Sequence, residues 1–428
     1  MRCHRVLIAA GFSATLCVGL AAQEPAPAAP AAAPPPDPVK TLVDRLDLEK
    51  YKATIKGLTQ FGDRRQGTDR NRAALDWIEA QLKSYGCANT ERLTFTYPSP
   101  EASDPSAPAR GAGAGRGRGA AAGPPGSPAG SDTRRGREGG SSQFGPRART
   151  GVYQPDAPGA APLDPRLREL NAQPTTPGER QNVYCTKVGS TRPDEMHIIG
   201  GHMDGHGWGE AANDDGSGTA LVMELARIFS APDVQTDRSI RFILWNNEET
   251  GLNGAWAYVH QRKDRQGKED PPGSGKYPEP KWLGMIQHDM MMWDHGMPVG
   301  DGRVAPEQRR EADVNIEFQM NSKQADASQK LAWAFKAAND KYATDYPAQV
   351  GPHMTNTDST PFMNLVPAIS LRENERGMQI GAGSNPNWHQ PSDVFTTYTD
   401  KDFRLGLNAA QTTLGAIAQL TGVSVVAK

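Results

Sequence analysis

Residues 196–218 read MHIIGGHMDGHGWGEAANDDGSG, an apolar run followed by a loop crowded with polar residues. The apolar part, Met196–Gly201, is typical of a short buried strand, and the helical spacing of later apolar residues predicts a helix over Gly218–Phe229. The stretch therefore predicts a strand, a loop and a helix in succession. The loop holds imidazole and carboxylate side chains between two regular elements.

The same alternation of strands and helices continues along the chain. Further strands are predicted for Leu93–Tyr97, Asn182–Thr186, Ser239–Trp245, Leu283–Asp289, Val314–Met320 and Val366–Leu371. Further helices are predicted for Asp69–Tyr85, Leu252–Gln261, Gln324–Asp340 and Asp400–Leu420. Because the two kinds of element alternate, we expect an α/β fold. We expect a three-layer sandwich in which helices flank a mostly parallel, mixed central sheet.

The amino terminus has the composition of an export signal. A basic start precedes the apolar run Val6–Leu20, which is too short to span a membrane. We interpret residues 1–22 as a signal peptide, the alternative being a short membrane anchor. Residues 23–38 are rich in Ala and Pro, so we expect them to form a stiff spacer. A secreted or periplasmic protein without stable membrane insertion is therefore expected.

A second biased segment interrupts the folded part of the chain, residues 39–428. From about 98 to 177 the sequence is rich in Gly, Pro and Arg and poor in large apolar residues. Such a composition does not offset the entropy of ordering, so we expect a disordered insertion. The rest, about 300 residues, is enough for one domain with a large core. The net charge of −2 gives no reason to expect nucleic acid as a partner.

Two cysteines remain after removal of the signal peptide, Cys87 and Cys185. They lie in or beside segments that could pair as neighbouring strands across the insertion. An even pair in an oxidising compartment can form a disulfide. Two buried free thiols are the alternative.

Metal-ligand residue types follow the predicted strands. His202 comes directly after its strand, Glu248 and Glu249 follow the next, and Asp289 closes a third, while Asp214 precedes a helix. Sites in open α/β sheets gather beyond the carboxyl ends of the strands, so these side chains can converge. Imidazole with carboxylates is a donor set that suits zinc. The pattern predicts a metal-dependent hydrolase.

With HMD at 202–204, NDDGSG at 213–218, EE at 248–249 and WHQPSD at 388–393, the chain resembles the M28 family of zinc peptidases. The resemblance extends from the segment LTQFGDR at 58–64 to His389 and implies a zinc exopeptidase-like fold with two zinc ions per chain. It makes Asp214 the bridging ligand. Glu249 and His389 are then the other ligands of one ion, and His202 and Asp289 those of the second.

The resemblance also implies two catalytic roles and a backbone feature. Asp204 resembles the carboxylate that orients His202. Glu248 resembles the general base that takes a proton from a metal-bridging water and passes it to the leaving amine. The Asp214–Asp215 peptide resembles a cis bond of the family.

Several neighbouring residues compete for these roles. Asp294 is a rival of Asp289, and we place His206 and Glu210 at the rim of the site. Some family members place a Tyr four residues before an Asp that here is Asp358. This chain has Met354 there, with His353 beside it as a candidate substitute. The sequence lacks the HExxH and GxSxG motifs of other hydrolases.

The expected function is that of an exported aminopeptidase that hydrolyses the N-terminal bond of peptide substrates. The surplus of acidic groups favours a substrate ammonium over a carboxylate. Arg372 is the candidate cation for a carboxypeptidase, unless it is a structural ion-pair partner. The alternatives are a dipeptidase or carboxypeptidase of the same family, a single-zinc glutaminyl cyclase, and a non-catalytic ectodomain that has lost its metals.

Overall fold

A computed structural model describes the folded unit that begins at Asp37. The described residues are 37–87, 89–97, 141–142, 145–146, 153–293, 314–352, 357–373 and 385–426. The expected signal peptide, nearly all of the spacer, and residues 98–140 of the insertion lie outside them. Asp294, His353 and Met354 also lie outside, so their proposed roles stay predictions.

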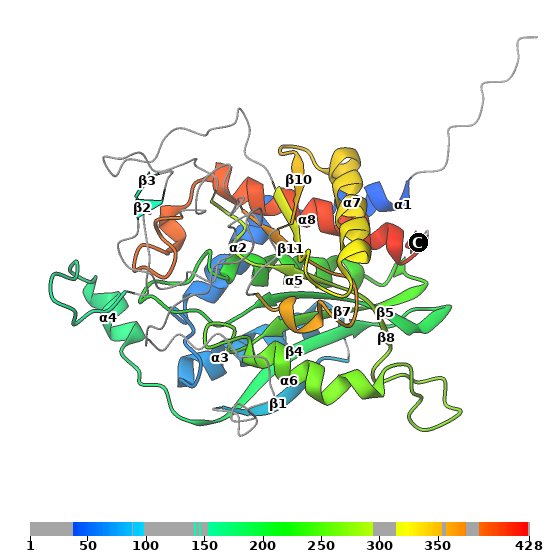
Figure 1. Cartoon of the computed structure of the whole chain (residues 1–428), viewed down its shortest axis with the longest axis horizontal. Coiled ribbons are helices and arrows are strands. Elements are labelled where there is room, and N and C mark those ends of the chain that lie inside the picture. Colours follow the sequence, from blue (N-terminus) through cyan, green and yellow to red (C-terminus); the bar gives the residue numbers. More distant parts are fainter. Residues whose placement is uncertain are drawn as a thin grey trace, which may run out of the picture. The chain divides into compact units, whose positions relative to one another are not determined.

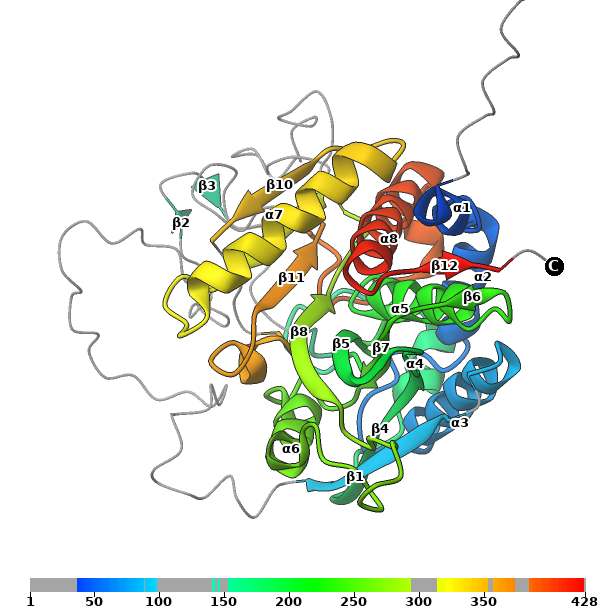
Figure 2. The ribbon, with the colours of Figure 1, turned by 90° about the vertical axis from the view of Figure 1, so that its right-hand side faces the viewer.

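An eight-stranded sheet forms the centre of the fold. Its order is β1-β4-β7-β5-β8-β11-β9-β10. Figure 2 shows β1 and β4 at the lower end of the sheet and β11 and β10 at the upper end. The strands in this order are β1 (Glu91–Tyr97), β4 (Gly178–Lys187), β7 (Arg238–Trp245), β5 (Arg192–His202), β8 (Lys281–His288), β11 (Ala368–Arg372), β9 (Val314–Phe318) and β10 (Ala348–Gly351). Strands β7, β5, β8 and β11 are mutually parallel. Antiparallel pairs join β1 to β4, β4 to β7 and β11 to β9, so the mixed, mostly parallel sheet is confirmed.

Helices cover both faces of the sheet (Figure 1). They are α1 (Pro38–Val43), α2 (Leu48–Thr59), α3 (Asp69–Ser84), α4 (Pro165–Asn171), α5 (Gly216–Phe229), α6 (Asn253–Arg262), α7 (Ala325–Tyr342) and α8 (Asp400–Leu420). Single 3-10 turns are η2 (Lys263–Arg265), η3 (Thr360–Phe362) and η4 (Phe395–Thr397). Short strands outside the main sheet are β2 (Ser141–Ser142), β3 (Gly145–Pro146), β6 (Val234–Gln235) and β12 (Ser424–Val425).

The alternation of side chains along the strands divides the core in two. Phe242 of β7 belongs to the larger cluster, with α2, α3, α5, α7 and α8, whereas the next residue, Ile243, belongs to the smaller cluster with α6. Successive residues of a strand point to opposite faces, which explains this division. Helix α5 is buried almost all round, as expected for a helix between a sheet and an outer layer of helices.

Part of the expected disordered insertion is folded, which corrects the boundary at 177. Residues 153–177 include α4, and Tyr153, Leu163 and Leu167 form a small apolar cluster with Trp208 and Val394. These few large side chains are buried against residues of the main domain. The average composition of the whole segment does not reveal them. The folded part of the insertion therefore rests on the loop that follows β5.

Cys87 and Cys185 form a disulfide, with their Cα atoms 5.9 Å apart. The bond connects the segment after α3 to β4. It lies next to the antiparallel pairing of β1 with β4, which the sequence predicts and the structure contains. Among the described residues, no helix is both long and apolar enough to cross a membrane.

Candidate metal centre

The ends of three adjacent parallel strands position most of the candidate ligands. His202 is the last residue of β5, Asp289 directly follows β8, and Glu248 and Glu249 follow β7 within a few residues. Since β5 lies between β7 and β8 and runs parallel to both, these residues meet at one edge of the sheet. The convergence expected from the sequence is present.

Asp214 lies between two histidines that come from distant parts of the chain. Its Oδ1 is 3.4 Å from Nε2 of His202, and its Oδ2 is 3.0 Å from Nε2 of His389. His389 belongs to the loop before α8, whereas Asp214 directly precedes Asp215, the N-cap of α5. One carboxylate thus presents an oxygen to each imidazole.

The remaining candidates complete two groups around this carboxylate. Asp289 Oδ1 is 3.8 Å from His202 Nε2, and Glu249 Oε2 is 3.0 Å from His389 Nε2. Asp214 Oδ2, His389 Nε2 and Glu249 Oε1 are buried and accept or donate no hydrogen bond within the described part of the chain. Buried polar atoms are normally satisfied, so a cation is the partner that fits this donor set.

Asp215 fixes the strand ends and the helix relative to each other. Its carboxylate accepts hydrogen bonds from the backbone N–H groups of His202 at 3.0 Å, Gly218 at 2.8 Å and Met290 at 3.1 Å. It therefore caps α5 and holds the ends of β5 and β8. The peptide bond between Asp214 and Asp215 is cis, as the resemblance implies.

Asp204 differs from its expected role in one respect. The backbone carbonyl of Asp204, not its carboxylate, is the hydrogen-bond partner of His202 Nδ1, at 2.9 Å. The carboxylate is 3.9 Å from that nitrogen and accepts a hydrogen bond from the backbone N–H of Glu248 at 3.1 Å. Asp204 thus holds His202 through its main chain and the Glu248 segment through its side chain.

Arg64 is a structural anchor of the loop after β5 that we did not identify from the sequence. Its fully buried guanidinium donates to the carbonyls of Met203 at 2.7 Å, Glu210 at 2.9 Å and Ala211 at 2.8 Å. A single side chain thus satisfies three carbonyls of the loop that runs from His202 to Asp214. In the sequence, the LTQFGDR segment stands out only through its resemblance to the family, because a buried arginine produces no periodic pattern.

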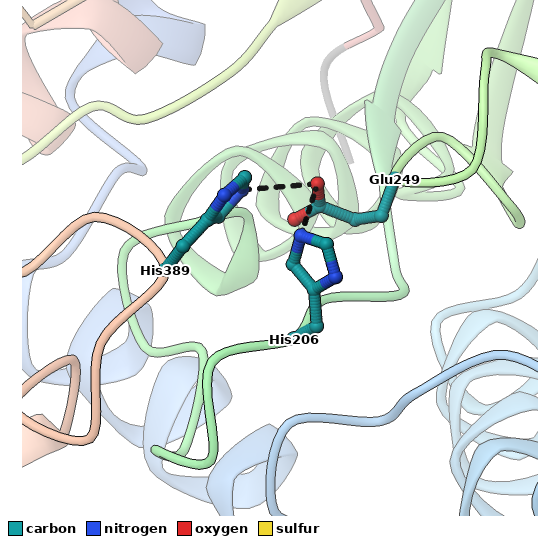
Figure 3. A group of neighbouring side chains, drawn as sticks. All are labelled: His206, Glu249 and His389. Carbon is teal, nitrogen blue, oxygen red and sulfur yellow. Dashed lines mark ion pairs between the residues drawn. The ribbon is translucent and has the colours of Figure 1, made fainter. Parts of the chain in front are cut away.

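Of the two residues assigned to the rim of the site, His206 contacts a candidate ligand and Glu210 does not. His206 Nε2 is 3.0 Å from Glu249 Oε2, and Figure 3 shows that the imidazoles of His206 and His389 both point at this carboxylate. Glu210 is buried and accepts a hydrogen bond from the backbone N–H of Phe395 at 2.9 Å. His206 thus touches a candidate ligand although its side chain is 20% exposed, whereas the contacts of the Glu210 carboxylate are with Phe395 and Arg166.

Burial and mutual charge shift the protonation of the ligand groups. Burial opposes ionisation of Asp214, yet the adjacent imidazoles of His202 and His389 hold its pKa well below the usual range. Against the same burial penalty, the charges of His206 and His389 lower the pKa of Glu249 to about 2. Burial disfavours the charged form of His389, but Glu249 and Asp214 raise its pKa to about 9. Opposite charges thus dominate the ligand pairs.

Carboxylates outside these pairs have raised pKa values. Burial raises the pKa of Asp204 to about 6, and burial and the charge of Glu248 raise that of Asp358 well above its usual range. The carboxylates gathered here whose side chains are almost inaccessible to solvent are Asp204, Asp214, Asp215, Glu248, Glu249, Asp289 and Asp358. Keeping so many buried carboxylates ionised is costly unless cations offset their charge.

Imidazoles and carboxylates gathered at the carboxyl edge of a parallel sheet define a class of protein, the α/β enzymes that work with a metal ion. The model of peptidase family M28 matches residues 182–411, more than half of the sequence, and the chain belongs to this family.

Two sequence relatives each match a short part of the chain. Aminopeptidase YwaD of Bacillus subtilis is 37% identical over 74 residues, which cover 17% of this chain and 16% of the relative. Carboxypeptidase Q of Homo sapiens is 30% identical over 82 residues, which cover 19% and 17%. The chain therefore aligns with less than a fifth of the length of either relative.

Solved structures share the fold over nearly the whole chain. BSAP, a zinc aminopeptidase from Bacillus subtilis, superposes with a TM-score of 0.55 and 15% identity, covering 90% of this chain and 97% of the other. Glutaminyl cyclase from Porphyromonas gingivalis gives a TM-score of 0.51 and 14% identity, with coverages of 88% and 99%. Both likenesses concern the fold alone.

Proposed function

We propose that the protein is a zinc-dependent exopeptidase that removes residues from the amino terminus of peptides. The observation that carries the proposal is the position of Asp214, whose two oxygens face His202 and His389 at 3.4 and 3.0 Å. A carboxylate in this position can be shared by two ions. Each ion then receives one further imidazole and one further carboxylate from the same edge of the sheet.

The proposed ligands are His202, Asp214 and Asp289 for one zinc ion, and Asp214, Glu249 and His389 for the other. Bound at such a site, zinc supplies Lewis acidity and lowers the pKa of a water molecule. The three carboxylates offset three of the four positive charges, so the centre stays electrophilic. Asp214 Oδ2 and His389 Nε2 face each other at 3.0 Å without a hydrogen bond, and Glu249 Oε1 has no hydrogen-bond partner among the described residues, which supports this assignment.

Glu248 is the proposed general base. Its backbone N–H is held by Asp204, and one of its carboxylate oxygens lies close to both His202 and Glu249. A carboxylate there can take the proton of the attacking water and deliver it to the leaving amine. The adjacent Glu249 faces the proposed ligand His389. One of the two neighbouring glutamates is therefore the proposed base and the other a proposed metal ligand.

The direction of cleavage follows from charge. Buried carboxylates at the site, of which Glu248 is one, suit a substrate ammonium. A carboxypeptidase would need a cation to hold the chain end. Arg372, the cation that the sequence offers, is fully buried and paired with Asp289 at 3.0 Å and Glu317 at 3.5 Å. These contacts favour the aminopeptidase direction.

A carboxypeptidase or dipeptidase is the second candidate, because carboxypeptidase Q is among the sequence relatives. A single-zinc glutaminyl cyclase shares the fold. The presence of His202 and Asp289 beside Asp214 favours two ions over one. Export is part of the proposal as well. The Cys87–Cys185 disulfide supports it, because such bonds persist in oxidising compartments.

A panel of end-blocked peptides tests the proposed direction. Zinc-loaded protein is incubated with one tripeptide in three forms: unmodified, N-acetylated and C-amidated. We expect acetylation to abolish cleavage and amidation to change it little. Cleavage of the acetylated but not the amidated form would show a carboxypeptidase instead. Conversion of an N-terminal glutaminyl peptide without hydrolysis would show a cyclase.

A further inference from the structure

We propose that His206 is a protein ligand of the metal ion that Glu249 and His389 hold. This half of the centre then has four protein donors, counting Asp214, whereas the half formed by His202, Asp214 and Asp289 has three. The inference rests on the proposed metal centre and adds a ligand and an asymmetry to it.

The two imidazoles face one carboxylate oxygen. Nε2 of His206 and Nε2 of His389 each lie 3.0 Å from Oε2 of Glu249 (Figure 3). The ring centroids are 4.2 Å apart and the rings are nearly perpendicular, at 80°. Both nitrogens are buried and form no hydrogen bond with any described residue. Imidazole nitrogens and a carboxylate that converge on one point are a zinc donor set.

Glycines on both sides bring the backbone of His206 against the other candidate ligands. A Cβ on Gly207, which has a φ of +104°, would lie 2.3 Å from the backbone carbon of His389. A Cβ on Gly205 would lie 2.8 Å from the carbonyl oxygen of Asp214. Only residues without side chains permit this approach. The sequence Gly205-His206-Gly207 thus places one imidazole where two ligand backbones meet.

The loop that carries His206 is held on both sides. Arg64 binds the carbonyls of Met203 and Glu210 at 2.7 and 2.9 Å, and the buried amide of Asn171 donates to the carbonyl of Gly209 at 2.9 Å. The position of His206 is therefore set by the fold. Its side chain is 20% exposed, so a simple ion pair with Glu249 at the surface is the competing interpretation.

A fourth donor changes how the two ions behave. Four protein ligands fill a tetrahedral zinc site, whereas three leave a position open for water or substrate. The ion held by His206 should therefore resist chelation, and the ion held by His202 and Asp289 should exchange readily. A surface ion pair would produce no such difference that depends on His206.

Chelation of zinc tests the ligand role without reference to activity. Wild type, His206→Ala, His206→Gln and the control His260→Ala, which removes an exposed histidine of α6, are loaded with zinc and titrated with a chelator. Loss of partners outside the ligand shell already costs about 10–100-fold in metal affinity, so loss of a direct donor should cost at least that. We expect both His206 variants to lose the chelator-resistant ion, and His260→Ala to keep it.

A spectroscopic measurement on wild type covers the case in which the variants do not fold. X-ray absorption of protein loaded with one equivalent of zinc counts the imidazoles at the tighter site, and we expect two. One imidazole, or unchanged retention of zinc in folded His206 variants, would overturn the inference while leaving the metal centre intact. Wild type that binds no zinc would instead refute the proposed function itself.

Discussion

The guanidinium of Arg372 lies 3.0 Å from Oδ2 of Asp289, a candidate ligand, and both side chains are buried. Burial disfavours an ionised Asp289, but the charge of Arg372 lowers its pKa far below the usual range. The pair thus keeps this carboxylate ionised and turned toward His202. Arg372 also contacts Glu317, 3.5 Å from its Nε.

Removal of this buried cation should destabilise the fold and weaken one metal site. Arg372→Met leaves the buried carboxylates of Asp289 and Glu317 without this cation. Such a loss typically costs about 3–5 kcal/mol of unfolding free energy. Urea denaturation measures the loss, and zinc titration should show weaker binding of one ion. Arg72→Met, which breaks an exposed pair with Asp69, is the control and should change little. Equal stability of the two variants would contradict the structural role of Arg372.

Glu248 and Glu249 are adjacent but should respond differently to the same change. Glu248→Gln removes the proposed base and leaves every proposed ligand, so turnover should fall by about 10²–10⁴-fold with zinc content unchanged. Glu249→Gln should lose zinc, because its Oε2 lies 3.0 Å from His389 Nε2. Metal analysis and peptide hydrolysis of both variants separate the roles. A fully active Glu248→Gln enzyme would remove Glu248 from the mechanism.

The Cys87–Cys185 bond should contribute strongly to stability. It joins residues separated by 98 positions in sequence. For a closed loop of that size, the chain-entropy model gives about 4–5 kcal/mol. Chemical denaturation with and without reductant should show a loss of this order. The double variant Cys87→Ser/Cys185→Ser should have the same unfolding free energy as the reduced protein, and reductant should not change it. Identical curves for oxidised and reduced wild type would contradict the prediction.

His197 of β5 should make the protein sensitive to mild acid. Burial, and secondarily the charge of Arg238, lower its pKa to about 4, against about 6.5 in the unfolded chain. As pH falls through 6.5, the unfolded state takes up a proton that the folded state does not. Stability is therefore complete above pH 6.5 and declines by about 3 kcal/mol down to about pH 4.

Replacement of this histidine tests the linkage. His197→Leu should flatten the dependence of unfolding free energy on pH between 6.5 and 4, even if it lowers stability at neutral pH. His260→Leu, at an exposed position of α6, should leave the dependence as it is in wild type. An unchanged slope in His197→Leu would show that other groups account for the acid sensitivity.

The sequence predicts those parts of the fold that depend on local periodicity. Helix α8 has the predicted bounds Asp400–Leu420. The candidate ligands at or just after the ends of β5, β7 and β8 could be grouped because parallel strands share a carboxyl edge. Arg64 could not be predicted, because its partners lie 139–147 residues away. The contact between His206 and Glu249 could not be predicted either, because it depends on how closely the backbone of Gly207 approaches that of His389.

Residues 153–177 show a different limit of sequence analysis. Their average composition is that of a disordered segment. Three large apolar residues and the buried amide of Asn171, which bonds Asp63 and Gly209, nevertheless hold part of them in place. Composition reports the mean tendency of a segment, whereas burial depends on whether a complementary surface is within reach. That surface is formed by residues far away in the sequence.

The number of zinc ions per chain tests the central claim most directly. Native mass spectrometry of zinc-replete protein counts bound ions, with Asp214→Asn as the variant that removes the shared carboxylate. We predict two ions in wild type and weakened binding of both in Asp214→Asn, because Asp214 faces His202 and His389 at once. At most one ion in wild type, or two tightly held ions in Asp214→Asn, would contradict a centre built around Asp214.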